Sequence, residues 1–560
     1  MSPFGARRRT QGIGWPVVVA LAALAPLCFL GLFFAWPVGS ILRLGFVSDG
    51  SLDLSGFGDV FGRQRTWRII GQTLAQSVTA TVITVLVGVP GAHLLYRCRF
   101  PGRGLARVLV TVPFVLPTVV VGVAFRNLLV EGGLLEGLGA DGTFTAVVAA
   151  LVFFNYAVVV RTVGSMWAHL DPRPEQAARA LGATPWKAFV SVTLPALWPA
   201  IASAASLVFL FCATSFGTVL VLGGPGYGTI ETEIWVQTTQ FLDLRSAAVL
   251  SVVQLAIVVA SLYLAARSRR RREATLRLRV DKSVERPLQL SDAPVIAVTA
   301  AVTAGLLLTP LVSLMVGSLR VGDHWGLDHY RNLSSTGSGG LLEVSVWEAA
   351  TNSVRIAIDA TWIALLVGGL ACLVLTRRPR AASGRRALAV FDGLFMLPLG
   401  VSAVTVGFGL LVALDLGPFD LRGSALLVPV AQAVVAVPLV VRTLLPVLRA
   451  VDSRLREAAA VLGAGPARVF WAVDLPVLGR SLGLSVGFAL AVSLGEFGAT
   501  SFLARPERPT LPVAIARLIG RPGAENLGMA LAASTVLAVA TTLVIAVAER
   551  VRMSSPGSDL

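Results

Sequence analysis

Long apolar runs dominate this chain, and short polar loops separate them. Twelve runs approach or exceed the roughly 20 residues that a helix needs to cross a bilayer. Continuous runs favour helices over the strands of a membrane barrel, whose sequence shows short alternating segments. We therefore predict an all-α polytopic membrane protein with about 12 transmembrane helices. The expected spans are approximately 15–42, 70–95, 107–130, 144–170, 197–222, 246–266, 292–318, 350–376, 388–414, 424–448, 478–503 and 526–549.

Composition agrees with this assignment. Of the 560 residues, 55% are hydrophobic and 14% are charged, whereas soluble proteins are about 25% charged. The mean hydropathy is +0.77. The first apolar stretch, at about 16–36, is longer than the core of a signal peptide, so we expect it to be retained as a span.

The net charge of +16 has two possible explanations. Basic chains can bind nucleic acid, but membrane proteins also gather Lys and Arg in their cytoplasmic loops. With twelve spans, the basic segments all fall on one side: Arg7 to Arg9, the loops after spans two and eight, and the linker that begins "RSRRRREATLRLR" at 267. The opposite loop at 131–142 is acidic. We therefore expect both termini in the cytoplasm, a place in the cell membrane and no nucleic-acid partner.

The cysteines and histidines form no ligand pattern in the sequence. The four cysteines are scattered, with no C-x-x-C spacing, which predicts neither a disulfide nor a metal site. These residues are Cys28, Cys98, Cys212 and Cys372, and the histidines are His93, His169, His324 and His329.

An internal repeat divides the chain. A constant offset of 281 residues aligns the two halves without a gap from about 73 to 230. The matched pairs include "VVRT" at 159–162 and 440–443, "LP" at 116–117 and 397–398, and Phe216-Gly217 and Phe497-Gly498. We expect two six-span halves, 1–266 and 292–560, joined by a basic cytoplasmic linker at 267–291. Parallel repeats of this kind suit a transport path between the halves.

Two polar, alanine-rich segments stand out from this apolar background. The first polar loop (171–195) contains "EQAARALGATPWKAF" and the second polar loop (452–476) contains "REAAAVLGAGPARVF". Each reads as a capped helix, a glycine turn and a second short helix, on the cytoplasmic side. Small alanines let a helix fit a groove on another protein. A helix lying on the membrane is the alternative, but it would favour a broad apolar face with basic flanks.

The second polar loop resembles the signature loop of ABC importer permeases. That signature is Glu-Ala-Ala, three residues, Gly, nine residues, an aliphatic, one residue and Leu-Pro, and 457–476 fits it. The first polar loop departs from it, because Gln176 stands at the Glu position and Glu175 lies one place early. The resemblance implies a type I ABC importer permease fold in which both loops dock on ATPase subunits. The implied coupling residues are Glu175, Gln176, Ala177, Ala178, Gly182, Glu457, Ala458, Ala459 and Gly463.

The resemblance also implies partners and a class of substrate. Two ATP-binding cassette subunits would dock in the cytoplasm, an extracytoplasmic binding protein would deliver substrate, and the chain itself would hold no cofactor. The fused arrangement resembles the iron(III) and thiamine branch, and the stretches 215–235 and 493–520 look most like thiamine permeases. A thiamine-like cation is favoured and ferric iron comes next. Permeases for sulfate, molybdate, phosphonate or polyamine, and an ion-coupled 6+6 secondary transporter, are the alternatives.

A single acid inside the predicted eleventh span marks a candidate substrate path. Glu496 would cost roughly 2.5–3.5 kcal/mol at the centre of a bilayer, so it should face the bundle interior. Its repeat partner is Ser215, and Phe216 and Phe497 follow these two residues. We expect all four to line the path, with Glu496 meeting a cationic substrate. The alternative is a structural ion pair between Glu496 and Arg126.

Two further arginines occupy equivalent places before the polar loops. Arg161 and Arg442 either support those loops or snorkel towards the membrane surface.

The chain carries no motif for ATP hydrolysis. There is no G-x-x-x-x-G-K-[ST] or H-E-x-x-H pattern. "GGPGYG" at 223–228 follows a membrane helix and lacks the strand–turn–helix setting of a phosphate loop, so we interpret it as an outer turn. We therefore expect a transport subunit whose energy comes from partners, and no membrane-embedded enzyme.

Overall fold

The computed structural model describes residues 14–553 apart from 49, 131, 225, 271–285, 377–380 and 416–423. Within that part, nine helices are long and apolar enough to cross a membrane. They are Ala22–Phe46, Gln64–Arg97, Phe144–Ala168, Pro185–Ala213, Leu244–Tyr263, Leu290–Leu319, Val346–Leu375, Leu427–Ala450 and Ala524–Arg550. Each overlaps one of the twelve predicted spans, so the all-α polytopic fold is confirmed.

Two of the remaining predicted spans are broken helices. α5 (Arg103–Val115) and α6 (Thr118–Leu129) meet at 103° instead of forming one span over 107–130. Between them lies Pro117, which lacks an N–H and keeps Leu116 in extended backbone. The same "LP" separates α18 (Ala382–Met396) from α19 (Ala403–Asp415), with a 3-10 turn, η9 (Leu397–Gly400), between them. The prediction that 107–130 and 388–414 are continuous is therefore wrong.

The predicted fifth and eleventh spans end earlier than expected. α10 (Leu194–Ala213) and α23 (Leu475–Gly495) stop, and the short helices α11 (Gly217–Leu222) and α24 (Thr500–Leu503) follow. Two unpredicted helices come next, α12 (Ile230–Thr239) and α25 (Leu511–Ile519). Their N-caps, Thr229 and Thr510, are separated by the repeat offset.

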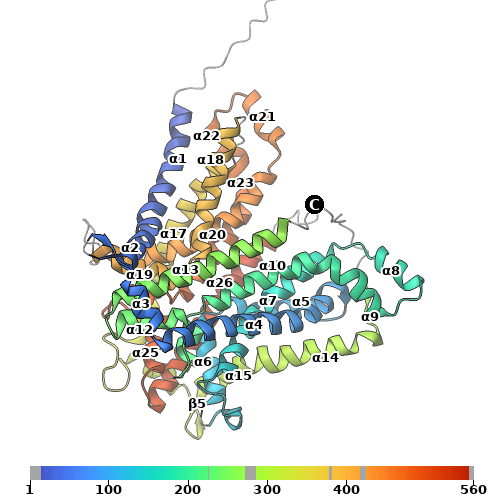
Figure 1. Ribbon diagram of the computed structural model, residues 1–560. Coiled ribbons are helices and arrows are strands. Elements are labelled where there is room, and N and C mark those ends of the chain that lie inside the picture. Colours follow the sequence, from blue (N-terminus) through green and yellow to red (C-terminus); the bar gives the residue numbers. More distant parts are fainter. Residues whose placement is uncertain are drawn as a thin grey trace, which may run out of the picture.

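The two halves form two arms of equivalent helices. In the first arm, α4 (Gln64–Arg97), α7 (Phe144–Ala168) and α10 pack on one another. In the second arm, α17 (Val346–Leu375), α20 (Leu427–Ala450) and α23 pack in the same way. The arms diverge from a shared region around α12 and α19 (Figure 1). α13 (Leu244–Arg270) and α26 (Ala524–Met553) close each half by packing on α10 and α23.

The first helix of each half packs against the opposite half. α1 (Gly14–Leu30) continues through the π-turn η1 (Gly31–Ala35) into α2 (Trp36–Phe46), and α1 contacts α17. α14 (Ala293–Ala301) continues through η7 (Val302–Leu308) into α15 (Thr309–Leu319), where α14 contacts α4 and α15 contacts α6. Figure 1 shows α1 beside the second arm and α14 along the first. The sequence halves are thus exchanged at their first spans.

Short elements complete the described chain. β1 (Val47–Ser48) pairs with β2 (Ser51–Leu52) and β5 (Arg320–Val321) with β6 (His324–Trp325), both antiparallel, while β3 (Cys98–Arg99) pairs in parallel with β4 (Arg286–Pro287). The remaining short helices outside the polar loops are α3 (Ser55–Gly62), η2 (Glu136–Leu138), η6 (Leu290–Asp292), α16 (Asp328–Arg331) and η8 (Asn332–Ser334).

Candidate functional site

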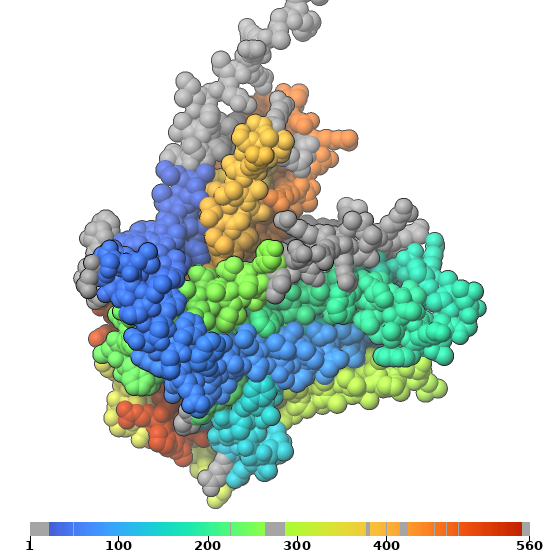
Figure 2. All heavy atoms as spheres, viewed as in Figure 1, coloured from blue at the N-terminus to red at the C-terminus, as the bar shows by residue number. Residues whose placement is uncertain are grey.

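The two polar loops lie at the far ends of the two arms. The first contains α8 (Arg173–Ala180) and α9 (Pro185–Ala188), and the second contains α21 (Ser453–Val461) and α22 (Pro466–Val469). Each leads through a π-turn, η3 (Phe189–Thr193) or η10 (Phe470–Asp474), into the next long helix. In Figure 1, α8 is at the tip of the arm on the right and α21 at the tip of the arm at the top, and Figure 2 shows the first tip as a separate projection of the surface.

Local signals in the sequence explain the shape of both loops. The Asp171 carboxylate accepts a hydrogen bond from the Arg173 N–H at 3.0 Å, and Asp452 accepts one from the Arg454 N–H at 2.9 Å. Gly182 and Gly463 follow the helices with φ values of +89° and +84°, a left-handed conformation that suits glycine. The predicted helix, glycine turn and second helix are therefore confirmed in both copies.

Each loop exposes the same face. Gln176 and Glu457 are exposed, as are the alanines that follow them, while Ala178 and Ala459 are half-buried. Leu181 and Leu462, separated by the repeat offset, are 89% and 87% exposed. Fully burying a leucine is worth about 1.5–3 kcal/mol. A matching pair of exposed leucines on a small alanine surface is therefore suited to burial against another protein.

A side-chain bond ties each loop to the helix that follows it. The Glu175 carboxylate accepts a hydrogen bond from the Thr193 hydroxyl at 2.8 Å. In the second loop, Arg456 donates from Nε to Asp474 at 2.8 Å. Glu175 and Arg456 are equivalent under the repeat offset, as are Thr193 and Asp474. Glu175 is therefore equivalent to Arg456 in the repeat and does not take the place of the signature glutamate, Glu457.

The candidate path residues come together between the halves. The rings of Phe216 and Phe497 stack with centroids 5.2 Å apart and planes 14° apart. Ser215 and Glu496 precede them in the breaks after α10 and α23, and all four side chains are buried. Glu496 therefore follows the end of α23. The expectation from the sequence, that it lies within a continuous eleventh span, is wrong.

Glu496 uses both carboxylate oxygens to cap the turn that follows. It accepts hydrogen bonds from the N–H groups of Ala499 at 2.7 Å and Thr500 at 3.0 Å, and from the Thr500 hydroxyl. Arg126 donates instead to the Ile519 carbonyl at 3.3 Å. The alternative of an ion pair between Glu496 and Arg126 is therefore wrong for the part of the chain that the structure describes.

Arg161 and Arg442 lie on α7 and α20 with exposed side chains. Among the described residues, neither makes a hydrogen bond or ion pair with its polar loop. The expected support of the loops is therefore absent, and the alternative, snorkelling towards the membrane surface, fits their exposure.

Sequence reasoning missed two buried acids on α12. Glu233 receives hydrogen bonds from Arg65, with Nη2 at 2.8 Å from Oε2 and Nε at 3.0 Å. Glu231 accepts a hydrogen bond from the Ser402 hydroxyl of the other half at 2.7 Å. The available signal was two acids in "TIETEIW", within an otherwise apolar and glycine-rich stretch.

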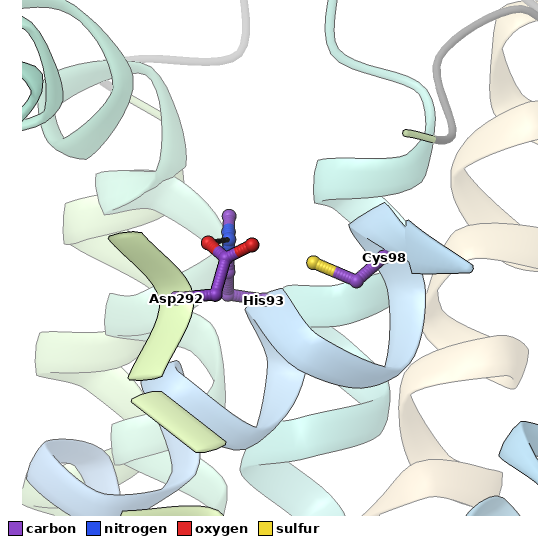
Figure 3. Close-up of side chains that lie close together, drawn as sticks. All are labelled: His93, Cys98 and Asp292. Atoms are coloured by element: carbon purple, nitrogen blue, oxygen red, sulfur yellow. Dashed lines mark ion pairs between the residues drawn. The ribbon is translucent and has the colours of Figure 1, made fainter. Parts of the chain in front are cut away.

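Three side chains with metal-binding atoms meet where the linker joins α14. His93, Cys98 and Asp292 bring one ligand atom each within 4.8 Å of the others (Figure 3). The sequence showed no pattern here because Asp292 lies almost 200 residues from the other two. Arg286 donates to both oxygens of Asp292 at 2.7 and 2.8 Å, and its Nη2 lies 3.3 Å from His93 Nε2.

That arrangement already holds a cation, the Arg286 guanidinium. The hydrogen bonds to the Asp292 carboxylate raise the pKa of Arg286. Burial raises the pKa of the Cys98 thiol, which disfavours the thiolate that metals bind. The cluster is therefore best described as an ion-pair clamp that fastens the linker to the end of α4.

A cavity of about 850 Å³ opens between α6, α15 and α26. Asn127, Arg320 and His329 contribute polar groups to its lining, and none of the predicted path residues does. Asn127 is engaged there with the Ser313 side chain and carbonyl.

Comparison with known proteins assigns the chain to a family. Residues 80–273 match the family described as "Binding-protein-dependent transport system inner membrane component". The sulfate transport system permease protein CysT of Escherichia coli is 34% identical over 190 residues, which cover 32% of this chain and 69% of CysT. The chain belongs to this family of transport components. It is the membrane-spanning permease of an ABC importer, and hence a transport subunit.

Other relatives of the permease match both halves together. The thiamine transport system permease protein ThiP of Brucella abortus (strain 2308) is 27% identical over 531 residues, covering 92% of each chain. ThiP of Salmonella typhimurium is 28% identical over 479 residues, covering 81% of the permease and 84% of that relative. The arrangement of two halves in one chain is thus shared with these relatives.

Proposed function

We propose that the permease imports an organic cation, thiamine in the first place. The observation that carries this proposal is the similarity to thiamine permeases along 92% of both chains. The sulfate permease CysT matches over 190 residues, which are 69% of CysT but only 32% of this chain, so its likeness does not extend to both halves together. The buried acids between the halves agree with a cation, because they would repel sulfate or molybdate. Ferric iron carries the same sign of charge and is the next candidate.

We further infer that two ATPase subunits dock on the two polar loops. The equivalent exposed faces around Gln176 and Glu457, each with an exposed leucine, support one docking site per arm. The coupling set Glu175, Gln176, Ala177, Ala178 and Gly182, with Glu457, Ala458, Ala459 and Gly463, is then divided by role. Glu175 holds the first loop in place, the two glycines form the turns, and the remaining residues contact the ATPases.

ATP binding would draw the two ATPases together and move the arms as rigid bodies. A rocking motion of this kind opens the path alternately to each side of the membrane. In this scheme the polar loops and both termini lie in the cytoplasm, and an extracytoplasmic binding protein delivers substrate at the opposite side of the cell membrane. The permease needs no cofactor of its own and no nucleic acid.

The path runs past the stacked pair in this proposal. Ser215, Phe216, Glu496 and Phe497 form the boundary between the halves, and aromatic faces attract cations by about 0.5–2 kcal/mol. Separating the halves would unstack Phe216 from Phe497 and open a passage lined by both rings.

Uptake by reconstituted vesicles tests the proposed function. The permease, its ATPase and its binding protein are placed in proteoliposomes, and the accumulation of radiolabelled thiamine is followed with and without enclosed ATP. We expect accumulation that needs ATP and the binding protein and that unlabelled thiamine abolishes. Uptake that continues without ATP and collapses with an ion gradient would instead support a secondary transporter, and selective uptake of sulfate would overturn the cation proposal.

A further inference from the structure

Glu231 is a buried carboxylate at the boundary between the two halves. It lies in the first turn of α12, and its side chain is fully buried. One oxygen, Oε2, accepts a hydrogen bond from the Ser402 hydroxyl, which belongs to the break before α19 in the opposite half. No basic side chain pairs with Glu231 among the described residues. A buried carboxylate without a cation is costly, because ions lose their hydration.

The second oxygen of Glu231, Oε1, accepts no hydrogen bond of normal geometry, although the Gln254 side chain lies close enough to interact with the carboxylate. Its neighbour on α13 is Gln254, whose amide nitrogen donates to the Ala213 carbonyl at 2.9 Å. The Gln254 oxygen is also buried without a hydrogen bond, as is Glu231 Oε1. An unsatisfied buried polar group costs about 1–3 kcal/mol. A group with positive charge or N–H donors would satisfy these two neighbouring acceptors.

Two neighbours of Glu231, Trp235 and Ser402, connect it to the stacked phenylalanines. Trp235 lies one turn after Glu231 on the same face of α12, and its ring centroid is 6.5 Å from that of Phe216. On the other side, Ser402 directly precedes Ala403. Ala403 packs closely on Gly498, because a Cβ added to Gly498 would lie 2.9 Å from the Ala403 Cβ. Gly498 follows Phe497 directly. Glu231 therefore shares α12 with Trp235, whose ring adjoins Phe216, and its partner Ser402 adjoins the segment that packs beside Phe497.

We propose that Glu231, with Gln254, binds the positively charged group of the substrate as the cation passes between the halves. This inference rests on the proposed import of a planar organic cation and names the carboxylate that recognises it. Glu231 is better placed for that role than Glu496, because both oxygens of Glu496 are engaged in capping the turn at Ala499 and Thr500. The aromatic rings beside Glu231 suit a flat cation, whose charge they also attract.

A neutral carboxyl group is the competing explanation. If Glu231 were protonated, its O–H could donate to the Gln254 oxygen and satisfy both acceptors without any ligand. Glu231→Gln separates the two cases, because glutamine supplies that N–H donor, keeps an acceptor for Ser402 and lacks the charge. A protonated Glu231 predicts that this variant works, whereas a cation-binding Glu231 predicts that it fails.

The experiment compares thiamine uptake by proteoliposomes that contain the full transporter with wild-type, Glu231→Gln or Glu231→Asp permease. We expect Glu231→Gln to lower uptake at subsaturating thiamine by at least about tenfold, since a buried ion pair loses its partner. Glu231→Asp, which keeps the charge, should retain clearly more uptake. ATP hydrolysis stimulated by the binding protein should persist in both variants and shows that the complex is assembled.

Glu348→Gln is the matched control. Glu348 is also an acid in the first turn of a helix and is exposed at the start of α17, where it accepts a hydrogen bond from the Ser345 N–H at 3.1 Å. Its replacement removes a similar interaction with the helix dipole and should leave uptake unchanged.

Two results would overturn the proposal. One is uptake by Glu231→Gln within twofold of wild type, and the other is an equal loss of uptake and stimulated ATP hydrolysis in both Glu231 variants. If wild type imports no thiamine, the proposed function fails first. Glu231→Gln is then measured with the substrate that the binding protein carries, and loss of import of an anion would contradict the cation site.

Discussion

Glu175 and Arg456 show how two loops of different sequence keep one shape. Each occupies the same place in its repeat, and each bonds to the residue 18 positions later, Thr193 or Asp474. A hydroxyl–carboxylate bond in one copy thus replaces an ion pair in the other. The acid that the ABC permease signature expects at 176 is absent, and Glu175 serves this different contact.

The remaining difference between the loops predicts unequal sensitivity to mutation. Gln176 and Glu457 are exposed at equivalent places, and only Glu457 offers a charge to a docked ATPase. We expect Glu457→Ala to lower the rate of ATP-driven uptake more than Gln176→Ala, by a few-fold, since a charge-assisted hydrogen bond is roughly twice as strong as a neutral one. Initial rates of uptake in proteoliposomes measure this difference. Equal initial rates of uptake in Glu457→Ala and Gln176→Ala would contradict the predicted difference between the two loops.

At the scale of elements, the helix breaks bring the halves together. α10 and α23 stop at equivalent places, and the segments that follow them pack against α6 and α19. A Cβ on Gly407 in α19 would lie 2.6 Å from the Ala499 Cα, and one on Gly217 would meet Thr118 and the Phe497 ring. Glycines at these positions permit a close approach of backbones that a larger side chain would prevent.

This packing predicts a local loss of stability in Gly407→Ala. The added methyl group meets backbone atoms of Ala499, and overpacking of this kind costs typically about 1–3 kcal/mol. The thermal unfolding temperature of the purified permease in detergent should therefore fall. Gly369→Ala in α17 is the control, because nothing lies within 4 Å of a Cβ there and alanine favours a helix. If the unfolding temperatures of Gly407→Ala and Gly369→Ala both equal that of the wild type, the close contact at Gly407 is contradicted.

Local and periodic features of the fold were predictable from the sequence, whereas tertiary ones were not. Asp171, Gly182 and their repeat partners carry caps and turns that act within a few residues, so both polar loops were predicted correctly. α12 was missed because a ten-residue helix is too short for a span and lies in a glycine-rich stretch. The role of Ser402 as partner of Glu231 could not be inferred, because it depends on a contact across the two halves.

At the scale of the whole molecule, the repeat yields two arms with one polar loop at each tip. The arms meet around α12 and α19 and diverge towards α8 and α21 (Figure 1). The exchanged first spans, α1 and α14, bind each half to the other, and the clamp of Arg286, Asp292 and His93 fastens the linker to α4. Movement at the tips can thus be transmitted to the boundary that holds Phe216, Phe497 and Glu231.

The central claim is that one chain carries two equivalent ATPase sites, and the mass of the purified complex tests it most directly. Native mass spectrometry of the wild-type permease with its ATPase should give one permease and two ATPase subunits. Leu181→Asp or Leu462→Asp should each leave one ATPase, because a charge replaces the exposed leucine that docking buries. The double variant should leave none, and Leu134→Asp, at another exposed leucine, should keep both. A wild-type complex with fewer than two ATPases, or a double variant that retains both, would contradict the account.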